Sequence, residues 1–455
     1  MKKLLLILAL GLLMIPGSAL ILAQDTGMME PIEDCTISFL TVWSGEDELP
    51  NWENMVAPFV EATGCTIEVE STRDLVPVLT TRVEAGNPPD IAGVPSFGAI
   101  RTFLDQGDVL PLDFLDQARL QEQFGDVWME LGTVDDTLYG VLPRAAIKSL
   151  VWYSPPAFEA AGYTVPASWD ELLDLCEQIV DDGAACFSIG LESGAASGWP
   201  ATDWLEDIML RTNSLETYDA WVDHTVSWTS EEVTLAWDAF GDIVGEPDFQ
   251  FGGPDGTLAT NFGAAPCPLF TDPPGAYLHR QASFIQSFIA DCPGGENLVP
   301  GEDFDFFLFP PIDDQYGTPA LGSADMFAMF NDTPGARALM DYLTQPEALA
   351  GWLEGGGSGI ATNNQFPLDL YPDVLTQRAA QVLQEATAFR FDASDLMPGD
   401  VNQAFWSGSL DFVQNPDNLN SILQNIEDVA QSAYGAMAED MEAEGDMAAT
   451  EEASS

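Results

Sequence analysis

The sequence predicts an α/β protein with parallel sheets, built from more than one compact unit. Strand patterns alternate with helical patterns over residues 36–94, which is the order of a βαβ chain. The 455 residues exceed what one ordinary hydrophobic core holds, so we expect two or three domains, or one fold of two lobes. Hydrophobic residues make up 46% of the chain, which excludes a disordered protein.

The first elements follow one another in strict alternation. Helical patterns at 52–60 and 75–85, each ended by a glycine, separate three short runs that we interpret as strands, at 36–42, 66–70 and 91–94. In parallel sheets, ligands bind beyond the carboxyl ends of the strands. Those ends carry Trp43-Ser44-Gly45-Glu46, Arg73-Asp74 and Pro95-Ser96.

The middle of the chain continues in the same manner, with longer connections. We predict strands at 149–153 and 185–191. A helix is predicted between them at 168–180, because the serine at its start is followed three residues on by a glutamate, as in a capping box. A loop rich in glycine, serine and aromatic residues is predicted at 192–204, after the second strand.

Helices dominate the last third of the sequence. One helix is predicted at 335–353, ended by the glycines at 355–357, and helical patterns cover most of 372–433. The acidic tail at 437–455 is poor in large apolar residues, so we expect it to be disordered.

The charge balance excludes several classes of function. Thirteen Lys and Arg stand against 74 Asp and Glu, and the formal net charge is -61. Such a field repels phosphate backbones, so nucleic acid is excluded as a partner. Two histidines, His224 and His279, and a single lysine beyond the leader, Lys148, supply little for metal or nucleotide chemistry. We therefore expect no metal and no cofactor.

The N-terminus has the pattern of a secretory signal peptide. Lys2 and Lys3 precede an apolar stretch, Leu4 to Ile15, and small residues follow up to Ala23. We predict a signal peptide at 1–23 and export to the periplasm or the outer face of the cytoplasmic membrane. An uncleaved anchor is the alternative, since the stretch through Ala23 reaches the length of a membrane span.

Six cysteines are an even number for an oxidising compartment, and 15 pairings are conceivable. None lies in a Cys-x-x-Cys pair, which argues against zinc. The first two each directly precede a predicted strand, so both would lie at one edge of the sheet. Nearest-neighbour pairing predicts the disulfides Cys35–Cys65, Cys176–Cys186 and Cys267–Cys292, with buried free thiols as the alternative.

An ordered series of motifs spans residues 36–435. It comprises Thr41-Val-Trp-Ser-Gly45, Phe59-Val-Glu-Ala-Thr-Gly64, Ala85-Gly-Asn-Pro-Pro-Asp90, Leu150-Val-Trp-Tyr-Ser154, Thr164-Val-Pro-Ala-Ser-Trp-Asp-Glu-Leu172, and the blocks at 276–284, 389–398 and 404–406. The series resembles the bacterial extracellular solute-binding proteins of carbohydrate-uptake ABC transporters. The later blocks are most similar to the α-glucoside-binding branch of that family.

The resemblance implies a two-lobe periplasmic-binding-protein fold (type II), whose lobes are joined by a hinge of chain crossovers and close on a sugar. The implied crossovers lie near 142–148, 309–322 and 355–363. The implied first lobe comprises 33–143 and 318–356, and the second comprises 144–317 and 357–436. We expect a monomer that delivers its sugar to the transmembrane permease of an ABC importer.

A sugar presents apolar C–H faces, on which aromatic rings stack, and hydroxyl groups, which charged and amide groups hydrogen-bond. Candidate ligand contacts are therefore the aromatic and charged residues at the strand ends and in the motifs of the family. They are Trp43, Glu46, Arg73, Asp74, Ser96, Lys148, Trp199, Asp203, Arg280, Asp325, Arg390, Asp392 and Trp406.

Candidates from the first lobe and the hinge have structural alternatives. Trp43 is also suited to packing inside the lobe, and Arg73 and Asp74 to a surface ion pair. Ser96 also fits simple turn chemistry. Lys148 lies at a crossover, where it would contact the sugar, pair across the cleft or be solvated.

Candidates from the predicted 192–204 loop, Trp199 and Asp203, lie where the family often supplies an aromatic platform, and a core position is the alternative. Arg280 is preferred to its neighbour His279, because an isolated histidine is more often structural. Asp325 lies where a strand of the first lobe is re-entered.

Near the C-terminus, Arg390 and Asp392 alternate around Phe391 and would project to one face of an extended segment. A structural ion pair is the alternative. Trp406 lies where maltose-type relatives place a stacking aromatic residue.

Two other functions compete with sugar binding. A secreted glycoside hydrolase would use two carboxylates, but the strand–helix series does not reach the eight units of a barrel. Neither a Gly-x-Ser-x-Gly elbow nor a Gly-Lys-Ser/Thr phosphate loop is present. The acidity would also suit a cationic ligand such as a polyamine. Aromatic and arginine-bearing strand ends fit a neutral polyol better, so we expect a binding protein for a sugar and not an enzyme.

Overall fold

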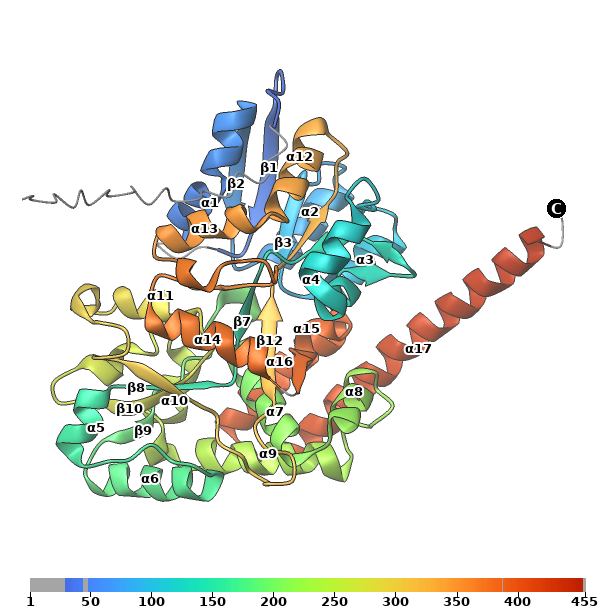
Figure 1. Ribbon diagram of the computed structural model, residues 1–455. Helices are drawn as coiled ribbons and strands as arrows, with labels where there is room; N and C mark the ends of the chain where they lie inside the picture. The colour runs from blue at the N-terminus through green and yellow to red at the C-terminus, as the bar shows by residue number, and fades with distance from the viewer. Residues whose placement is uncertain (1–28, 44–47, 387, 453–455) are drawn as a thin grey trace, which may run out of the picture.

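The computed structural model describes residues 29–43, 48–386 and 388–452, the last sixteen of these by their backbone alone. The predicted signal peptide and Glu46 therefore lie outside the described residues. Figure 1 shows two α/β lobes, one around β1–β3 and one around β8–β10, with strands β7 and β12 running between them.

The sheet of the first lobe has the order β2-β1-β3-β13-β6. Strand β1 (Thr36–Thr41) pairs in parallel with β2 (Thr66–Ser71) and β3 (Ile91–Val94), and β13 (Met326–Met329) and β6 (Gly140–Val141) extend the sheet antiparallel. Helices α1 (Glu48–Thr63) and α2 (Leu75–Glu84) connect the first three strands. The predicted alternation is confirmed.

The sheet of the second lobe has the order β11-β8-β10-β9. It comprises β8 (Leu150–Tyr153), β9 (Ala185–Phe187), β10 (Ala276–Arg280) and β11 (Asp305–Leu308). Helix α6 (Trp169–Asp181) is capped as predicted, because the Ser168 hydroxyl accepts the Glu171 N–H at 3.3 Å. Strand β9 is shorter than predicted: it ends at Phe187, whereas the predicted strand extended to residue 191.

A third sheet, of order β14-β7-β12-β15, lies between the other two. Its strands are β7 (Arg144–Ile147), β12 (Ala320–Ala324), β14 (Ile360–Ala361) and β15 (Phe389–Phe391). Strand β12 passes almost directly into β13 of the first lobe, so the chain crosses between lobes here. The implied crossovers lie in or beside these strands, and the lobe boundaries themselves stay a prediction.

Two helical segments differ from the prediction, and proline explains both. The helix predicted at 335–353 is two helices, α12 (Pro334–Leu343) and α13 (Pro346–Glu354), because Pro346 lacks an N–H and starts a new helix. The predicted 192–204 loop ends early, since α7 (Trp199–Thr212) begins after Gly198, with Pro200 in its first turn.

The C-terminal helices are α14 (Val374–Glu385), α15 (Ala393–Leu396), α16 (Gly399–Gln414) and α17 (Leu419–Glu452). Helix α17 projects from the body of the molecule (Figure 1) and includes the stretch for which disorder is expected, whose alanine, glutamate and methionine favour a helix. The remaining named elements are α3 (Phe97–Asp105), α4 (Gln117–Leu131), β4 (Thr133–Val134), β5 (Thr137–Leu138), α5 (Pro155–Ala161), α8 (Leu215–Val222), α9 (Glu231–Val244), α10 (Gly253–Ala259) and α11 (Ile285–Ala290).

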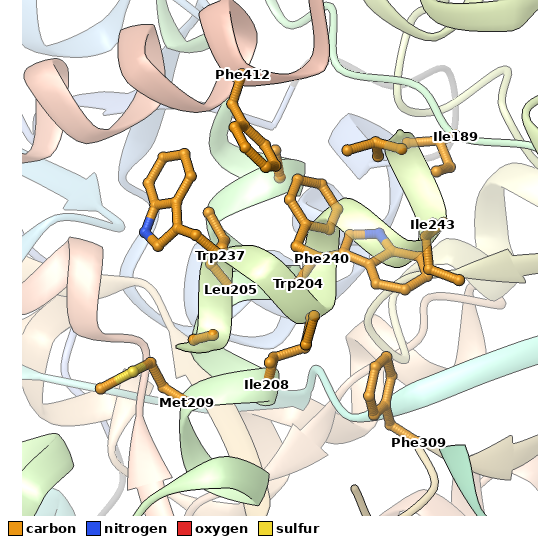
Figure 2. Close-up of a cluster of buried hydrophobic side chains, with 14 of the residues drawn as sticks. Ile189, Trp204, Leu205, Ile208, Met209, Trp237, Phe240, Ile243, Phe309 and Phe412 are labelled. Atoms are coloured by element: carbon orange, nitrogen blue, oxygen red, sulfur yellow. The ribbon is translucent and has the colours of Figure 1, made fainter. Parts of the chain in front are cut away.

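The core of the second lobe is built around α7. Figure 2 shows Trp204 and Leu205 of this helix beside Trp237 and Phe240 of α9, with Phe412 of α16 above them. From Pro200 to Thr212 every residue of α7 is buried, including its charged ones. Because buried charges need partners, this helix must carry an internal network of ion pairs.

The three predicted disulfides are confirmed, with S–S distances of 1.99, 1.99 and 2.06 Å in chain order. Cys35 and Cys65 lie at one edge of the first sheet, as expected, because Thr36 is in register with Thr66. Within the described residues, the helices are too short or too polar to cross a membrane.

Candidate functional site

A cavity of about 730 Å³ lies between the lobes, within the range of small-molecule sites. The first lobe lines it from the ends of β1 and β2, from α3 and from the β12–β13 junction. The second lobe contributes the start of α7, the segment around Phe284, α15 and α16. Eight of the predicted contacts line it: Trp43, Arg73, Ser96, Lys148, Trp199, Asp325, Asp392 and Trp406.

Trp43, Arg144 and Asp325 form one unit of the wall. The Trp43 indole N–H donates to Asp325 at 2.8 Å, and the Arg144 guanidinium donates to the same carboxylate at 3.4 Å. The guanidinium carbon of Arg144 also lies 4.6 Å from the centre of the Trp43 ring. Trp43 is only 2% exposed, so most of its ring packs inside the lobe and a small part is left for a ligand.

Arg73 and Asp74 do not pair with each other but reach toward the second lobe. Arg73 lies 3.0 Å from Glu48, and its guanidinium lies 4.9 Å from the ring centre of Phe262. The Asp74 carboxylate accepts the Ala195 N–H at 3.0 Å. The strand-end pair therefore contributes contacts between the lobes, and only Arg73 lines the cavity.

Lys148 is buried, which rules out the solvated alternative. Its ammonium donates to Asp203 at 2.7 Å and to Asp392, and lies 5.3 Å from the ring centre of Trp199. Asp203 is thus not on a loop but on α7, behind the wall, and Asp392 begins α15. Lys148 holds the two elements together beneath the cavity.

Charges in the wall and behind it form a buried network. Asp207 accepts the Arg280 guanidinium at 3.0 Å and that of Arg211 at 2.5 Å, and the network further includes Lys148, Asp203, Glu206, Asp392 and Asp395. Five carboxyls face three cations, so two carboxyls are in excess.

Raised pKa values of several carboxyls offset part of that excess negative charge. Burial, reinforced by the charge of Asp392, raises the pKa of Glu206 and of Asp395 well above the ordinary range. Burial acts in the same direction on Asp392, but the ammonium of Lys148 and the hydrogen bonds donated by the Asp395 N–H and the Ser394 hydroxyl together outweigh it and lower the pKa of that carboxyl. Burial also raises the pKa of Asp203, to about 7, so Glu206 and Asp395 are not the only carboxyls of the network whose neutral form is favoured.

Oxygens of Asp203, Glu206 and Asp392 lie within 4.8 Å of one another, as metal ligands would. The ammonium of Lys148 already bonds two of these carboxylates and supplies the positive charge. The cluster is therefore explained as a charge-compensated support for the cavity wall.

Comparison with known proteins agrees with this geometry. The model of the family "Bacterial extracellular solute-binding protein" matches residues 43–350. The chain belongs to this family. The resemblance drawn from the motifs is thus confirmed, and the family is one of binding proteins, not enzymes.

Two curated relatives resemble the solute-binding protein over most of its length. The osmoprotective compounds-binding protein GgtB of Synechocystis sp. is 42% identical over 396 residues, which cover 86% of this chain and 91% of the relative. The alpha-glucosides-binding periplasmic protein AglE of Rhizobium meliloti is 39% identical over 388 residues, which cover 83% of each.

Solved structures share the fold of the solute-binding protein. The solute receptor AcbH matches with a TM-score of 0.76 at 21% identity, and a chitin oligosaccharide binding protein with 0.74 at 16%. Each match covers 88% of this chain and 99% of the solved chain. At these identities the likeness establishes the two-lobe fold alone, which confirms the predicted fold class.

Besides Asp74 and Asp203, two further predicted contacts of the binding protein lie away from the cavity. The side chain of Arg280 is fully buried in the network with Asp207. Arg390 forms an ion pair with Asp219 at a distance of 2.5 Å, on a partly exposed surface. Arg390 and Asp392 therefore do not form the ion pair considered as an alternative, and Asp392 alone lines the cavity.

Sequence reasoning missed several lining residues, chiefly Glu48, Arg144, Phe262, Asp395 and Asn402. One signal was available for Arg144. Only 13 residues of the chain are Lys or Arg, and four of them, Arg73, Arg101, Arg144 and Lys148, line the described cavity. In a chain so poor in cations, an arginine beside a crossover is a strong candidate for the site.

Proposed function

We propose that this protein is the extracytoplasmic sugar-binding component of an ABC importer. It captures an oligosaccharide, most closely an α-glucoside, by closure of the lobes and delivers it to a membrane permease. The proposal rests on one observation: the cavity between the lobes is walled by aromatic rings and by arginines that already carry carboxylate partners.

The pairing of these charges supports a neutral, hydroxyl-rich ligand. Arg73 is balanced by Glu48, and Arg144 by Asp325, so each pair offers donors and acceptors side by side without a net charge. Hydroxyl groups need both. Six carboxyl groups and four cations line the described cavity, and burial raises the pKa of one of these carboxyls, Asp395, well above its ordinary range. The small surplus of carboxylates that is left favours a polyamine less than a wall of carboxylates alone would. The relatives GgtB, a binding protein for osmoprotective compounds, and AglE, a binding protein for alpha-glucosides, support glycosides or osmoprotective solutes as the ligand class.

Closure is supported by contacts that already join the lobes. The Asp74–Ala195 hydrogen bond and the stacking of Arg73 on Phe262 span the cleft beside the cavity. A ligand that contacts both walls stabilises this closed arrangement relative to an open one. The permease would then receive the closed, loaded form.

A calorimetric and thermal-shift panel tests the proposal. The full chain would be secreted with its leader from a bacterial host, purified, and titrated with maltose, trehalose, sucrose, cellobiose and spermidine. Binding of an α-linked sugar, recovered intact, with a raised unfolding temperature is the expected result. Binding of spermidine alone would overturn the sugar assignment, and cleavage of the sugar would overturn the transport role.

A further inference from the structure

One arginine of the described chain differs from all the other cations. Beyond Lys2 and Lys3 the sequence holds eleven Lys and Arg residues, and ten of them form an ion pair with a carboxylate in the described structure. The eleventh is Arg101, whose guanidinium has no ion pair and no hydrogen bond among the described residues, although 74 residues of the chain are acidic. Its surroundings decide what it can bind.

Arg101 lies on helix α3 of the first lobe, at the rim of the cavity, and its side chain is exposed. The start of α3 already meets the second lobe. The Ser96 hydroxyl donates to the Asp395 backbone carbonyl at 3.5 Å, and a Cβ at Gly98 would lie 1.6 Å from the Met397 carbonyl oxygen. Arg101 follows Gly98 by three residues and so shares its face of the helix. The contact between the lobes therefore ends within one helical turn of Arg101.

An unpaired carboxylate lies on the opposite side of this rim. Asp400 is in the first turn of α16 on the second lobe, three residues after Met397, and is exposed. It lines the same cavity as Arg101, and no cation or hydrogen-bond donor contacts its carboxylate in the described part of the chain. Because Gly98 meets Met397, about one turn of chain on each side of that contact separates the two charges. A small further approach of the lobes would bring them together.

Two other neighbours of Arg101 fit less well. Asp105 lies one turn further along α3, but a carboxylate C-terminal to its cation is the weaker order for a helical pair. Burial raises the pKa of the Tyr434 phenol on α17, and the charge of Arg101 acts against this, so α17 also lies near. The Tyr434 hydroxyl, however, already donates to the Val222 carbonyl. Of the three groups, Asp400 alone is a carboxylate on the other lobe.

We propose that Arg101 and Asp400 form a latch between the lobes: their side chains pair across the rim in the closed, loaded protein and separate when it opens. The latch adds to the Asp74–Ala195 contact and slows the escape of the ligand. Because both partners are exposed, the pair is weak and salt screens it, so retention of the ligand depends on ionic strength. The inference rests on the lobe closure of the proposed function but not on which solute the cavity holds.

Stopped-flow fluorescence of the full chain, loaded with trehalose or maltose, tests the latch. At about 0.01 M salt, Arg101→Gln and Asp400→Asn should each speed dissociation about 2- to 5-fold, and at about 1 M salt they should match the wild type. Both positions are exposed, so the variants should unfold at the wild-type temperature. Arg82→Gln, which removes an arginine of the same lobe away from the cavity, is the matched control. Wild-type rates for both variants at low salt would overturn the latch.

Exchange of the charges distinguishes a pair from two independent effects. Arg101→Asp and Asp400→Arg each place like charges at the rim and should speed dissociation more than the neutral variants do. The double variant should return to within about twofold of the wild type, whereas additive effects would contradict a pair. Glu439→Gln with Asp440→Asn, in the part of α17 that follows the rim, should leave the rate unchanged. An effect equal to that of Asp400→Asn would assign Arg101 to α17 and overturn the proposal.

A cross-linking test needs no ligand. The six native cysteines are all in disulfides, so Arg101→Cys with Asp400→Cys adds the only free thiols. A short bis-maleimide should join these two thiols in the full chain, as shown by mass spectrometry of the digested protein, and should not join Arg82→Cys to Asp400→Cys. Absence of the first cross-link would overturn the latch. Failure of both sugars to bind, with the cross-link formed, would overturn the proposed function and support the approach of the lobes at this rim.

Discussion

Two groups of charged residues meet the cavity, and they differ in how far water reaches them. The Arg73–Glu48 pair in the wall retains side-chain exposures of 26% and 15%. The Lys148–Asp203 pair beneath it retains 6% and 1%. A pair that water still reaches can exchange a water contact for a ligand hydroxyl, whereas a fully buried pair can change partners only at a large energetic cost. We therefore propose that the first group contributes to recognition of the ligand and that the second supports the wall on which recognition depends.

We expect the largest effect from removing the buried ammonium of Lys148. We expect Lys148→Met to reduce the free energy of unfolding by about 3–5 kcal/mol, because Asp203 and Asp392 lose their counter-charge in a buried site. Urea unfolding near neutral pH measures this loss in the free energy of unfolding. The control is Arg337→Met, which breaks an exposed pair with Asp332 and should cost less than about 1 kcal/mol. Equal losses for the two variants would contradict the assigned role of Lys148.

The next test addresses the wall. We expect Arg144→Ala to weaken sugar binding by about 10- to 100-fold, as for the loss of a charged hydrogen bond. Calorimetry with the preferred sugar measures the affinity. Arg82→Ala, which breaks the Arg82–Glu70 pair on the same lobe away from the cavity, is the matched control and should bind normally. Normal binding by Arg144→Ala would exclude this arginine from recognition.

A third prediction concerns Glu206, a buried carboxyl of the ion-pair network that supports the cavity wall. Burial, together with Asp392 and Asp203, raises the pKa of Glu206 in the folded state. Above the unfolded pKa, near 4.3, the folded state then binds a proton that the unfolded state lacks. Between the unfolded pKa and the raised pKa of the folded state, the contribution of Glu206 to the free energy of unfolding therefore falls as the pH rises, by up to about 1.4 kcal/mol per pH unit.

Glu206→Gln removes this titration. Its unfolding free energy relative to the wild type should therefore rise between pH 5 and pH 8, measured by urea unfolding at constant ionic strength. Glu231→Gln, at the exposed start of α9, should instead give a curve parallel to that of the wild type. A parallel curve for Glu206→Gln would mean that Glu206 is ionised in the folded protein.

The smallest expected effect concerns closure. Asp74→Ala removes the hydrogen bond to the Ala195 N–H and should weaken sugar affinity about 3- to 10-fold by favouring the open state. Small-angle X-ray scattering of the unliganded protein should report a larger radius of gyration. Asp238→Ala, at an exposed position of α9, is the control for surface charge. An unchanged radius and affinity would show that this contact does not stabilise closure.

Local signals in the sequence predicted the parts of the fold that depend on neighbours in the chain. The alternation over 36–94 and the glycine stops located the first five elements, and strands that begin after Cys35 and Cys65 indicated their pairing. The complete burial of helix α7 escaped prediction because Asp203 and its other charged residues are typical of an exposed segment. Only the partners supplied by distant segments, such as Lys148, make their burial possible.

The candidate site was less predictable for the same reason. Strand ends indicated Trp43, Arg73 and Ser96, because parallel strands bring their ends to one edge. Asn402 and Asp395 come from helices that meet the first lobe only when the chain has crossed the hinge, so no local pattern indicates them. Arg280 carried a motif of the family, but its side chain is used inside the lobe.

The disulfides have a consequence for how the molecule can be handled. They join residues separated by 30, 10 and 25 positions, and none of the six cysteines links the sheet of the first lobe to that of the second. The disulfides therefore cross-link each lobe internally and do not restrict the hinge motion of one lobe against the other. Reduction of the disulfides should then not change the affinity of the folded protein for its ligand. A reductant should lower the unfolding temperature of the protein, while the molecules that remain folded should bind the sugar with unchanged affinity.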